Sequence, residues 1–535
     1  MKQTDTNRVV QGAFLLTIAG LFGKVLSAIY RVPLQNLTGD IGFYVYQQIY
    51  PLIGMVMILS LYGFPAAVST LTAKQRASNT PMTYKHFYVP IFVVLLLING
   101  VLFGVTICLA TYIASWIGDV QLERTFFFAA FLFLFIPFVA LFRGISQGYE
   151  RMQPTAYSQM VEQLIRVTII IVAAYLVYTG TLQLYDIGIF AVLATMIGMF
   201  FCLLTLRLSF RLEVDYLSLQ PRHIPWRHYF STIFMLGFIA AFNHMILLLL
   251  QFVDVFTLIP GLLQHNLPLE EAMQQKGIFD RGQPLIQFGI VFGSSFALAL
   301  IPSVITKDVK ENTTHLVYVR EAVLFSMYIA VGATVGLILL MKEVNIVLFT
   351  NELGTNSLQV LSLSILMAAM TITMIAILQT IGKTNVTAIY IVATVILKIV
   401  LNLLLIPRFG IMGSALATSG SLLFLCIIVA RLLRKLLPKL RIMHHVKWKG
   451  LLIATVMMTI VVGILKGIAF FLPFTRLTLA VYVLGTVIIG ALIYMICLIR
   501  YHVLSKHQYE ALPFSRLFLR LEKIVRKKDE EIGRK

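Results

Sequence analysis

Runs of roughly 20–25 apolar residues recur along the whole chain and are separated by short polar loops. A helix needs roughly 20 apolar residues to cross the hydrocarbon core of a bilayer. The runs lack the alternation of barrel strands, so they predict helices, which satisfy their own backbone groups inside the membrane. We expect about fourteen spans. They cover residues 9–34, 41–73, 84–114, 123–147, 155–179, 185–210, 227–258, 280–304, 318–341, 359–381, 386–406, 411–436, 448–471 and 476–500.

The composition agrees with a membrane protein and excludes a soluble globular chain. Of the 535 residues, 59% are hydrophobic and 12% are charged, and no polar stretch is long enough to form a soluble domain. The net charge of +20 would suggest a nucleic-acid partner in a soluble protein. The basic residues lie in short loops instead, where membrane topology accounts for them, so we expect no nucleic acid. The four cysteines lie singly, without metal-site spacing, and we expect no metal.

The loops differ in charge on the two sides of the predicted membrane. Loops that follow the even-numbered helices are rich in basic residues, such as Lys74, Arg151 and Arg431, whereas the opposite loops carry few. Because cytoplasmic loops are enriched in Lys and Arg, both termini are predicted to face the cytoplasm. We therefore expect a multi-pass protein of a bacterial cytoplasmic membrane.

Short matching segments indicate an internal repeat. Residues 154–156 (Pro-Thr-Ala) and 386–388 (Val-Thr-Ala) begin the fifth and eleventh helices, and residues 51–53 and 284–286 (both Pro-Leu-Ile) begin the second and eighth. Matches six helices apart in the same orientation predict two pseudo-symmetric six-helix lobes. The fold class is thus an all-α polytopic membrane protein with two lobes and two additional C-terminal helices.

The predicted organisation has four parts and one helix outside the membrane. They are an N-lobe at 1–210 (helices 1–6), a C-lobe at 211–440 (helices 7–12), helices 13–14 at 441–500, and a basic cytoplasmic tail at 501–535. The tail alternates basic and apolar residues, which suits a helix on the inner leaflet or a solubilising extension. Residues 261–283 predict a short helix on the outer side.

Charged side chains inside spans are costly and therefore mark candidate functional positions. Lys24 lies in the first helix, and Arg31 follows seven residues later on the same helix face. They predict a cationic stripe facing a water-filled, anion-accepting cavity, although Arg31 could also reach the outer surface. Arg166 and Lys398 occupy equivalent positions near mid-membrane and complete the predicted set of substrate-binding cations.

Three further groups are candidates for ion coupling. Glu162 precedes Arg166 by four residues, which is the favourable order for a structural pair within one helix. Lys398, in contrast, has no carboxylate nearby in sequence, so we expect it to face the cavity. Asp254 and His244 could couple transport to protons or sodium, although a membrane histidine more often bonds to a neighbouring helix.

At the outer mouth, Asp280 and Arg281 open the eighth helix and are candidates to pair with each other.

Residues 382–384 (Gly-Lys-Thr) resemble the end of a phosphate-binding loop, but Ile377 stands where that loop requires glycine. A membrane-bound polymerase or glycosyltransferase would need a large outer loop with catalytic carboxylates. We therefore expect no enzyme.

Three segments resemble a known group of transporters. They are residues 23–34 (GKVLSAIYRVPL), 42–51 (GFYVYQQIYP) and 277–285 (GIFDRGQPL). Together they resemble the polysaccharide-transporter branch of the multidrug/oligosaccharidyl-lipid/polysaccharide (MOP) flippase superfamily. The similarity is greatest to the group of stage V sporulation protein B and the MurJ-like lipid II flippases.

The resemblance implies a fold like that of the MurJ and MATE transporters, with alternating access to a central cavity. It implies export of an undecaprenyl-diphosphate-linked oligosaccharide or peptidoglycan precursor, with membrane lipids as surroundings and a monomeric transporter. Lys24 falls on the first basic cavity position of lipid II flippases, and the second falls on Tyr30 or Arg31. No cofactor is implied beyond H⁺ or Na⁺ coupling or the membrane potential. The alternative is a proton- or sodium-coupled multidrug exporter, with Asp254 and Glu162 as coupling groups; the mainly basic mid-membrane charge favours the flippase.

Overall fold

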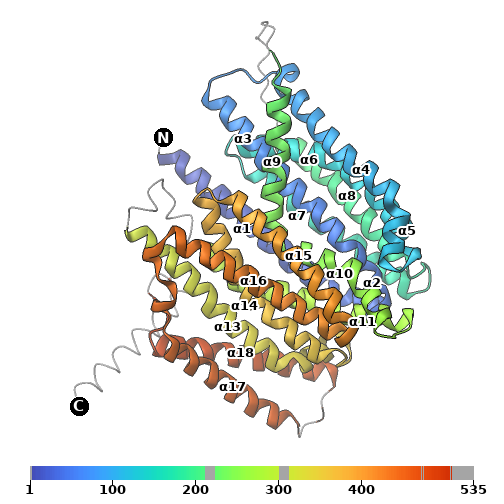
Figure 1. Ribbon diagram of the computed structural model, residues 1–535, viewed down its shortest axis with the longest axis vertical. Coiled ribbons are helices and arrows are strands. Elements are labelled where there is room, and N and C mark those ends of the chain that lie inside the picture. The colour runs from blue at the N-terminus through green and yellow to red at the C-terminus, as the bar shows by residue number, and fades with distance from the viewer. Residues whose placement is uncertain are drawn as a thin grey trace. The chain divides into compact units, whose positions relative to one another are not determined.

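The computed structural model describes residues 3–210, 223–299, 313–470, 473, 475–505 and 508 (Figure 1). All regular elements in these ranges are helices, which confirms the predicted all-α fold. The basic tail at 501–535 lies outside the described residues, apart from 501–505 and 508. The chain forms two compact units, residues 1–280 with 398–410 (unit 1) and residues 281–397 with 411–535 (unit 2).

Unit 1 contains most of the N-terminal half of the chain. Its α-helices are α1 (Gln3–Ile29), α2 (Arg31–Ile58), α3 (Phe64–Ala77), α4 (Val89–Ile117), α5 (Glu123–Ala130), α6 (Leu132–Gly148), α7 (Gln153–Tyr178), α8 (Asp186–Ser209), α9 (Trp226–His244), α10 (Ile246–Gln264) and α11 (Leu269–Asp280). Short turns η1 (Leu59–Gly63), η2 (Tyr84–Tyr88) and η3 (Val120–Leu122) lie between them. The last part of α15 (Thr384–Phe409) also belongs to unit 1.

Unit 2 contains the first part of α15 and further helices. They are α12 (Gly282–Ala299), α13 (Thr313–Phe349), α14 (Thr355–Thr380), α16 (Ile411–Leu436), α17 (Trp448–Phe470) and α18 (Arg476–Arg500), with the turns η5 (Pro438–Leu440) and η6 (Ile442–His445). Residues 211–280, which the sequence repeat assigns to the C-lobe, contribute their described helices to unit 1. The lobe boundaries remain a prediction, since compact units and repeats need not coincide.

The described helices include twelve segments that are long and apolar enough to cross a membrane. One of them, Ile18–Ala77, has 60 residues and is long enough for the first two predicted spans. The predicted eighth span corresponds to α12, which is followed by residues outside the described ranges. If Ile18–Ala77 is counted as two spans and α12 is added, the twelve segments correspond to the fourteen predicted spans. The chain is a multi-pass membrane protein.

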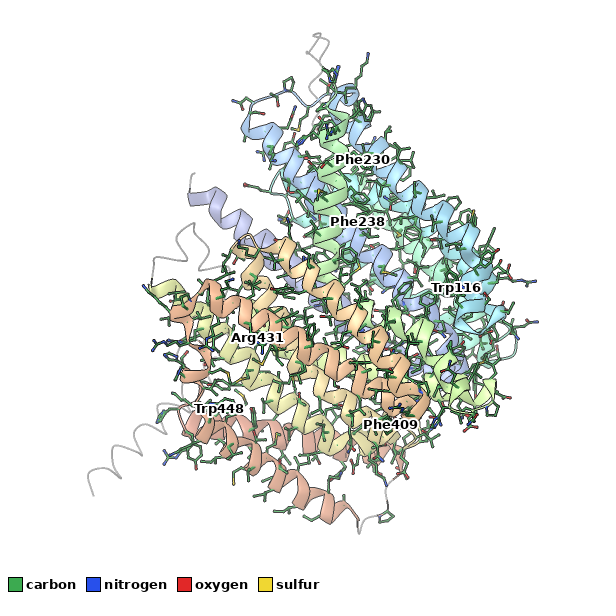
Figure 2. The ribbon with its side chains drawn as sticks, viewed as in Figure 1. Trp116, Phe230, Phe238, Phe409, Arg431 and Trp448 are labelled. Atoms are coloured by element: carbon green, nitrogen blue, oxygen red, sulfur yellow. The ribbon has the colours of Figure 1, made fainter. Side chains whose placement is uncertain are left out.

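The exposed side chains of the helices are largely apolar, as expected for helices in lipid (Figure 2). The three tryptophans all lie at helix ends. Trp116 precedes the last residue of α4, Trp226 begins α9 and Trp448 begins α17, and their exposed fractions are 58%, 44% and 53%. Exposed tryptophans at helix ends are typical of the two membrane–water interfaces.

Local breaks interrupt the first two predicted helices. The assignment of α1 ends before Tyr30, whose backbone angles remain helical (φ −68°, ψ −20°). The next helix, α2, begins at Arg31 with Pro33 in its first turn, where a proline needs no N–H partner. Gly39 has φ +69° and bends α2, a conformation that glycine adopts without steric cost. The turn η1 is π-helical and joins α2 to α3. The predicted seventh helix is broken at Met245 into α9 and α10.

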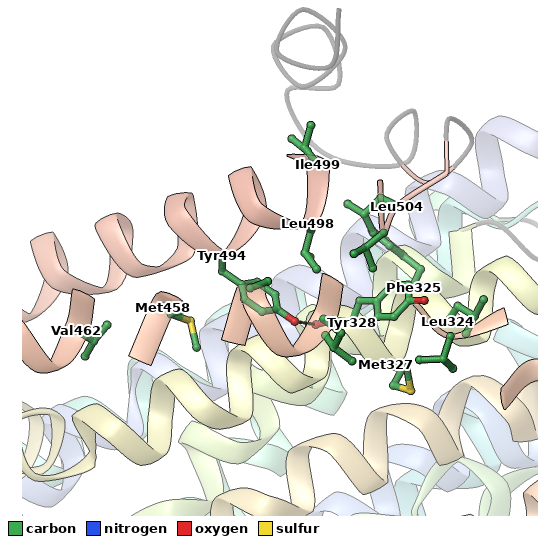
Figure 3. Packing of buried hydrophobic residues seen from close by; sticks show 14 of the residues in the cluster. Leu324, Phe325, Met327, Tyr328, Met458, Val462, Tyr494, Leu498, Ile499 and Leu504 are labelled. Atoms are coloured by element: carbon green, nitrogen blue, oxygen red, sulfur yellow. Dashed lines mark hydrogen bonds between the residues drawn. The ribbon is translucent and has the colours of Figure 1, made fainter. Parts of the chain in front are cut away.

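Unit 2 has its own apolar core where α17 and α18 pack against α13 (Figure 3). The core includes Tyr328 of α13, Met458 of α17 and Leu498 of α18. The Tyr494 hydroxyl donates a hydrogen bond to the Tyr328 carbonyl oxygen at 2.7 Å. This bond satisfies the buried hydroxyl and fixes α18 against α13.

Candidate functional site

Lys24 is the one predicted substrate-binding cation that is exposed. It lies on α1, which packs against α7, and the adjacent Gly23 is buried against Gln159 and Gln163 of α7. Lys24 forms no ion pair or hydrogen bond with any residue that the structure describes. An accessible, unneutralised ammonium within an apolar helix is a candidate for binding an anionic ligand.

Arg31 lies in a cluster of tyrosines at the start of α2. Its guanidinium stacks over the Tyr50 ring at 3.9 Å, and its side chain is fully buried. The hydroxyl groups of Tyr30 and Tyr46 contact each other, and the rings of Tyr46 and Tyr50 lie 5.9 Å apart. The expected exposed stripe is therefore wrong for Arg31. The backbone stays helical at Tyr30, so the reason is packing: the Tyr50 ring covers the Arg31 guanidinium.

Arg166 of α7 lies near two of the same tyrosines. It donates a hydrogen bond to the Gln163 Oε1 atom at 2.6 Å and contacts the Met57 sulfur. Its charge acts on both Tyr46 and Tyr50. Two arginines and three tyrosines thus form one buried cationic-aromatic cluster between α2 and α7. The tyrosines were not among the predicted site residues, although the i, i+4 spacing of Tyr46 and Tyr50 places them on one helix face.

Glu162 does not pair with Arg166. Its carboxylate forms a buried ion pair with Arg143 of α6 at 2.9 Å. Arg143 also donates to the Ser158 hydroxyl at 3.2 Å and to the Ser60 carbonyl oxygen of η1 at 3.4 Å. The predicted pair within α7 is therefore wrong, because a neighbouring helix supplies a better-placed cation. Arg143 lies at the end of an apolar run, and this position could have identified it from the sequence as a candidate site residue.

Lys398 is buried and paired, contrary to the expectation that it faces a cavity. Its ammonium lies 2.9 Å from an Asp254 carboxylate oxygen, and both side chains are at most 3% exposed. The Asn402 amide donates to the same oxygen at 2.8 Å and to the Thr257 hydroxyl at 2.7 Å. The carboxylate that the sequence could not find near Lys398 comes from α10. Asp254, predicted for ion coupling, is thus one half of a buried α10–α15 ion pair.

His244 ends α9 and is exposed. Its ring stacks on the Tyr62 ring, with centroids 4.4 Å apart and an interplanar angle of 17°. Lys24 is close enough to His244 for their charges to interact. The structure therefore brings together two residues that the sequence assigned to different roles, a substrate-binding cation and an ion-coupling histidine.

At the predicted outer mouth, Asp280 and Arg281 have different partners. Asp280 forms a buried pair with Lys276, one turn earlier in α11, at 2.9 Å. Burial raises the pKa of the Asp280 carboxyl, and the nearby Lys276 ammonium partly opposes this effect. Arg281 donates to the Asn351 side-chain oxygen at 2.7 Å and lies over the Phe349 ring. The predicted pair of adjacent residues is wrong.

The helix α11 packs tightly against α2 at Gly277. A Cβ atom at this position would lie 2.2 Å from the Asp40 carbonyl oxygen. Since a backbone atom cannot turn aside, we expect Gly277→Ala to separate the two helices and lower stability by about 1–3 kcal/mol. Thermal unfolding of the purified protein measures this loss. Gly336→Ala is the matched control, because nothing lies within 4 Å of its Cβ and alanine favours a helix. Equal melting temperatures for the two variants would contradict the tight contact.

The residues that the structure describes contain no group of three His, Cys, Asp or Glu side chains that could hold a metal ion. The buried charged groups at the predicted site positions are instead bonded to or stacked on other side chains. Among the predicted site residues, Lys24 and His244 are the accessible ones within unit 1.

The sequence of the chain is similar to those of known membrane proteins. Residues 9–306 match the family model described as "Polysaccharide biosynthesis protein". The chain is 35% identical to the uncharacterized membrane protein YabM of Bacillus subtilis (strain 168) over 98% of both chains. It is 24% identical to the lipid II flippase MurJ of the same organism, over 95% of this chain and 98% of the relative.

A solved structure shares the fold of the chain. The lipid II flippase MurJ in an inward closed conformation matches with a TM-score of 0.68 and 14% sequence identity, over 91% of this chain and 99% of that one. This similarity shows the fold and confirms the MurJ-like architecture expected from the three sequence segments. Because the family model covers more than half of the chain, the chain belongs to the polysaccharide biosynthesis protein family, in the flippase branch of the MOP superfamily.

Proposed function

We propose that this membrane transporter exports an undecaprenyl-diphosphate-linked oligosaccharide or peptidoglycan precursor across a bacterial cytoplasmic membrane. Both termini would face the cytoplasm, and the protein would act without covalent chemistry on its substrate. The name of the MurJ relative supports a lipid-linked substrate. The relatives are named as membrane proteins or flippases and not as catalysts.

The observation that carries the proposal is the accessible ammonium of Lys24 within an apolar helix, which is unpaired among the described residues and lies in the same unit as a buried cationic-aromatic cluster. A diphosphate carries about two negative charges, and its transfer from water into a helix bundle is costly without compensating cations. Lys24 would meet the diphosphate directly. Arg31 and Arg166 would add a positive field from within unit 1, since their side chains are buried.

The same arrangement disfavours the multidrug alternative. A cationic drug or a coupling cation would need an acidic group that is available to it. Glu162 is bonded to Arg143, and Asp254 is bonded to Lys398, both within 3 Å. The two carboxylates proposed for coupling are thus already compensated by internal cations, so we retain the flippase as the proposed function.

The test is transbilayer movement of fluorescent lipid II by the purified protein in liposomes. We expect Lys24→Ala to slow flipping about tenfold or more, because it removes a charge-assisted contact to the diphosphate. Lys74→Ala is the control, since Lys74 is an exposed lysine at the end of α3. Lipid II flipping that is unchanged in Lys24→Ala would exclude the cation mechanism. Efflux of a cationic dye without lipid II flipping would favour the multidrug exporter.

An imposed membrane potential is a second variable in this assay. Outward movement of negative charge along an inside-negative potential releases roughly 2.3 kcal/mol per charge per 100 mV. We propose that this term drives export, so that dissipating the potential would slow flipping. Equal rates with and without the potential would leave a proton or sodium gradient as the energy source, which the same liposomes can supply.

A further inference from the structure

One buried carboxylate in unit 1 differs from the others in its surroundings. Four acidic side chains in the described part of the chain are at most 4% exposed, namely Asp119, Glu162, Asp254 and Asp280. In three of them a carboxylate oxygen lies 2.9 Å from a side-chain nitrogen of a basic residue. Asp119 forms no ion pair with any residue that the structure describes. Because a buried charge is costly without an opposite charge nearby, Asp119 is expected to have a cationic partner from outside the chain.

The hydrogen bonds of Asp119 all favour its ionised form. The hydroxyl groups of Tyr44 and Tyr185 both donate to its Oδ2 atom, at 3.1 and 2.8 Å. The backbone N–H of Gln121 donates to Oδ1 at 3.1 Å. Hydrogen bonds donated to a carboxylate stabilise the charged form over the acid. The arrangement therefore disfavours neutralisation by a proton and leaves a metal cation as the compensating charge.

A helix cap accounts for only part of this arrangement. Asp119 is the N-cap of η3, and the bond from Gln121 is the capping bond. The positive end of a helix dipole amounts to roughly half an elementary charge, and η3 has only three residues before α5 begins. The cap thus stabilises the carboxylate, but it does not cancel a full negative charge.

Gln48 provides a second, independent sign of a ligand. It stands one helical turn after Tyr44 on the same face of α2, and its side chain interacts with the Tyr44 hydroxyl. Gln48 is 1% exposed, and neither its amide oxygen nor its amide nitrogen has a hydrogen-bond partner among the described residues. Buried amides in folded proteins are normally bonded, so this one is expected to contact a bound ion or molecule.

We propose that Asp119, Gln48, Tyr44 and Tyr185 form a binding site for one sodium ion in unit 1. The ligands would be the Asp119 carboxylate, the Gln48 Oε1 atom and the two tyrosine hydroxyl oxygens, which keep lone pairs after donating their protons. Oxygen ligands suit a hard cation, and sites for divalent ions such as Ca²⁺ commonly use several carboxylates. A single carboxylate matches the charge of a monovalent ion.

The ion would join three separate segments of unit 1. Gln48 and Tyr44 lie on α2, Asp119 lies between α4 and α5, and Tyr185 immediately precedes α8. The Tyr185 hydroxyl also contacts the Met273 sulfur of α11 at 3.8 Å. Sodium is therefore expected to stabilise the folded protein, because it would bind the assembled site and not the separated segments.

The test measures equilibrium binding of ²²Na⁺ to the purified full-length protein in detergent by a scintillation proximity assay. We expect saturable binding by the wild type and its loss in Asp119→Asn, which removes the negative charge. Gln48→Met nearly preserves side-chain volume and leaves the three hydrogen bonds of Asp119 in place. It should weaken sodium binding about tenfold, because it removes one oxygen ligand.

The matched control is Glu270→Gln. Glu270 is an exposed carboxylate in the first turn of α11, and its replacement should leave the sodium affinity unchanged. Thermal unfolding in sodium chloride and in choline chloride at equal ionic strength gives a second readout. Sodium should raise the melting temperature of the wild type and of Glu270→Gln, and it should have little effect on Asp119→Asn. If Asp119→Asn does not fold, the affinity of Gln48→Met decides the test.

Three results would overturn the inference. The first is a wild-type protein without saturable sodium binding. The second is wild-type affinity in Gln48→Met together with wild-type affinity in any folded Asp119→Asn, which would place the ion elsewhere. The third is potassium that displaces ²²Na⁺ as strongly as unlabelled sodium, which would remove the assignment to sodium. Because these measurements need no lipid-linked substrate, their outcome is independent of the proposed function.

Discussion

Replacement of Lys398 by methionine is expected to lower the free energy of unfolding by about 3–5 kcal/mol. The substitution nearly preserves side-chain volume but leaves the Asp254 carboxylate buried without its ammonium partner, which lies 2.9 Å away in the structure. The Asn402 amide also bonds to this carboxylate, yet a neutral donor does not cancel its charge. Desolvation of the remaining carboxylate therefore dominates the expected loss. Denaturant or thermal unfolding of the purified protein in detergent measures it.

The matched control removes both charges together. Lys398→Met combined with Asp254→Asn should recover most of the lost stability, since a neutral pair in a buried site is often tolerated as well as an ion pair. A single variant as stable as the wild type would show that Asp254 is neutral or solvated in the folded protein. A double variant less stable than Lys398→Met would show that the hydrogen bonds of the Asp254 carboxylate contribute more to stability than its buried charge costs.

Replacement of Arg143 by methionine is the second change with a large expected effect, again about 3–5 kcal/mol of stability. The Arg143 guanidinium compensates Glu162 at 2.9 Å and bonds to Ser158 and to the Ser60 carbonyl oxygen. Its loss would leave a buried carboxylate and two buried backbone or hydroxyl groups without donors. Because Ser60 lies in η1, we also expect the position of Tyr62 to loosen.

Arg207→Ala is the control for Arg143→Met. Arg207 is an exposed arginine near the end of α8, and such substitutions usually change stability by less than about 0.5 kcal/mol. Arg143→Met with Glu162→Gln should be more stable than Arg143→Met alone. Matching melting temperatures for Arg143→Met and Arg207→Ala would contradict the role assigned to the buried network.

Helix positions were predictable from the sequence because hydrophobic runs report directly on membrane depth. The predicted span 411–436 coincides with α16, and 155–179 differs from α7 by two residues at its start and one at its end. The break at Met245 was not predictable in the same way. Neither glycine nor proline stands at 244–246, so the sequence carries no helix-breaking residue there.

Charge positions were also predictable, but their partners were not. The sequence identifies Asp254 and Lys398 as costly residues within spans. It cannot show that α10 and α15 meet, because Asn402 and Asp254 are 148 positions apart and periodicity describes only local structure. The 19 positions between Arg143 and Glu162 also place them on different helices. The local rule that paired Glu162 with Arg166 failed for this reason.

The same limit applies to the site around Lys24. Lys24 was identified as an accessible cation from its place in the first apolar run, and the structure leaves it accessible. Arg31 was assigned to the same face by counting seven residues through a continuous helix. The backbone stays helical at Tyr30, but the count cannot show that the Tyr50 ring covers Arg31. Tyr62 carried no sequence signal, because its place beside α1 and His244 is defined by contacts with α1 and α9, which the sequence does not show.

The π-helical turn η1 has a consequence for the comparison of related chains. A π turn holds one residue more than an α turn, so side chains after it are rotated by about 100° relative to an uninterrupted helix. A relative with a plain α turn at this point would need one residue fewer to keep Phe64 packed against Gly237. A gap of one position within Leu59–Gly63 would therefore preserve the fold, whereas the same gap in α2 or α3 would rotate the following side chains by about 100° away from their packing partners.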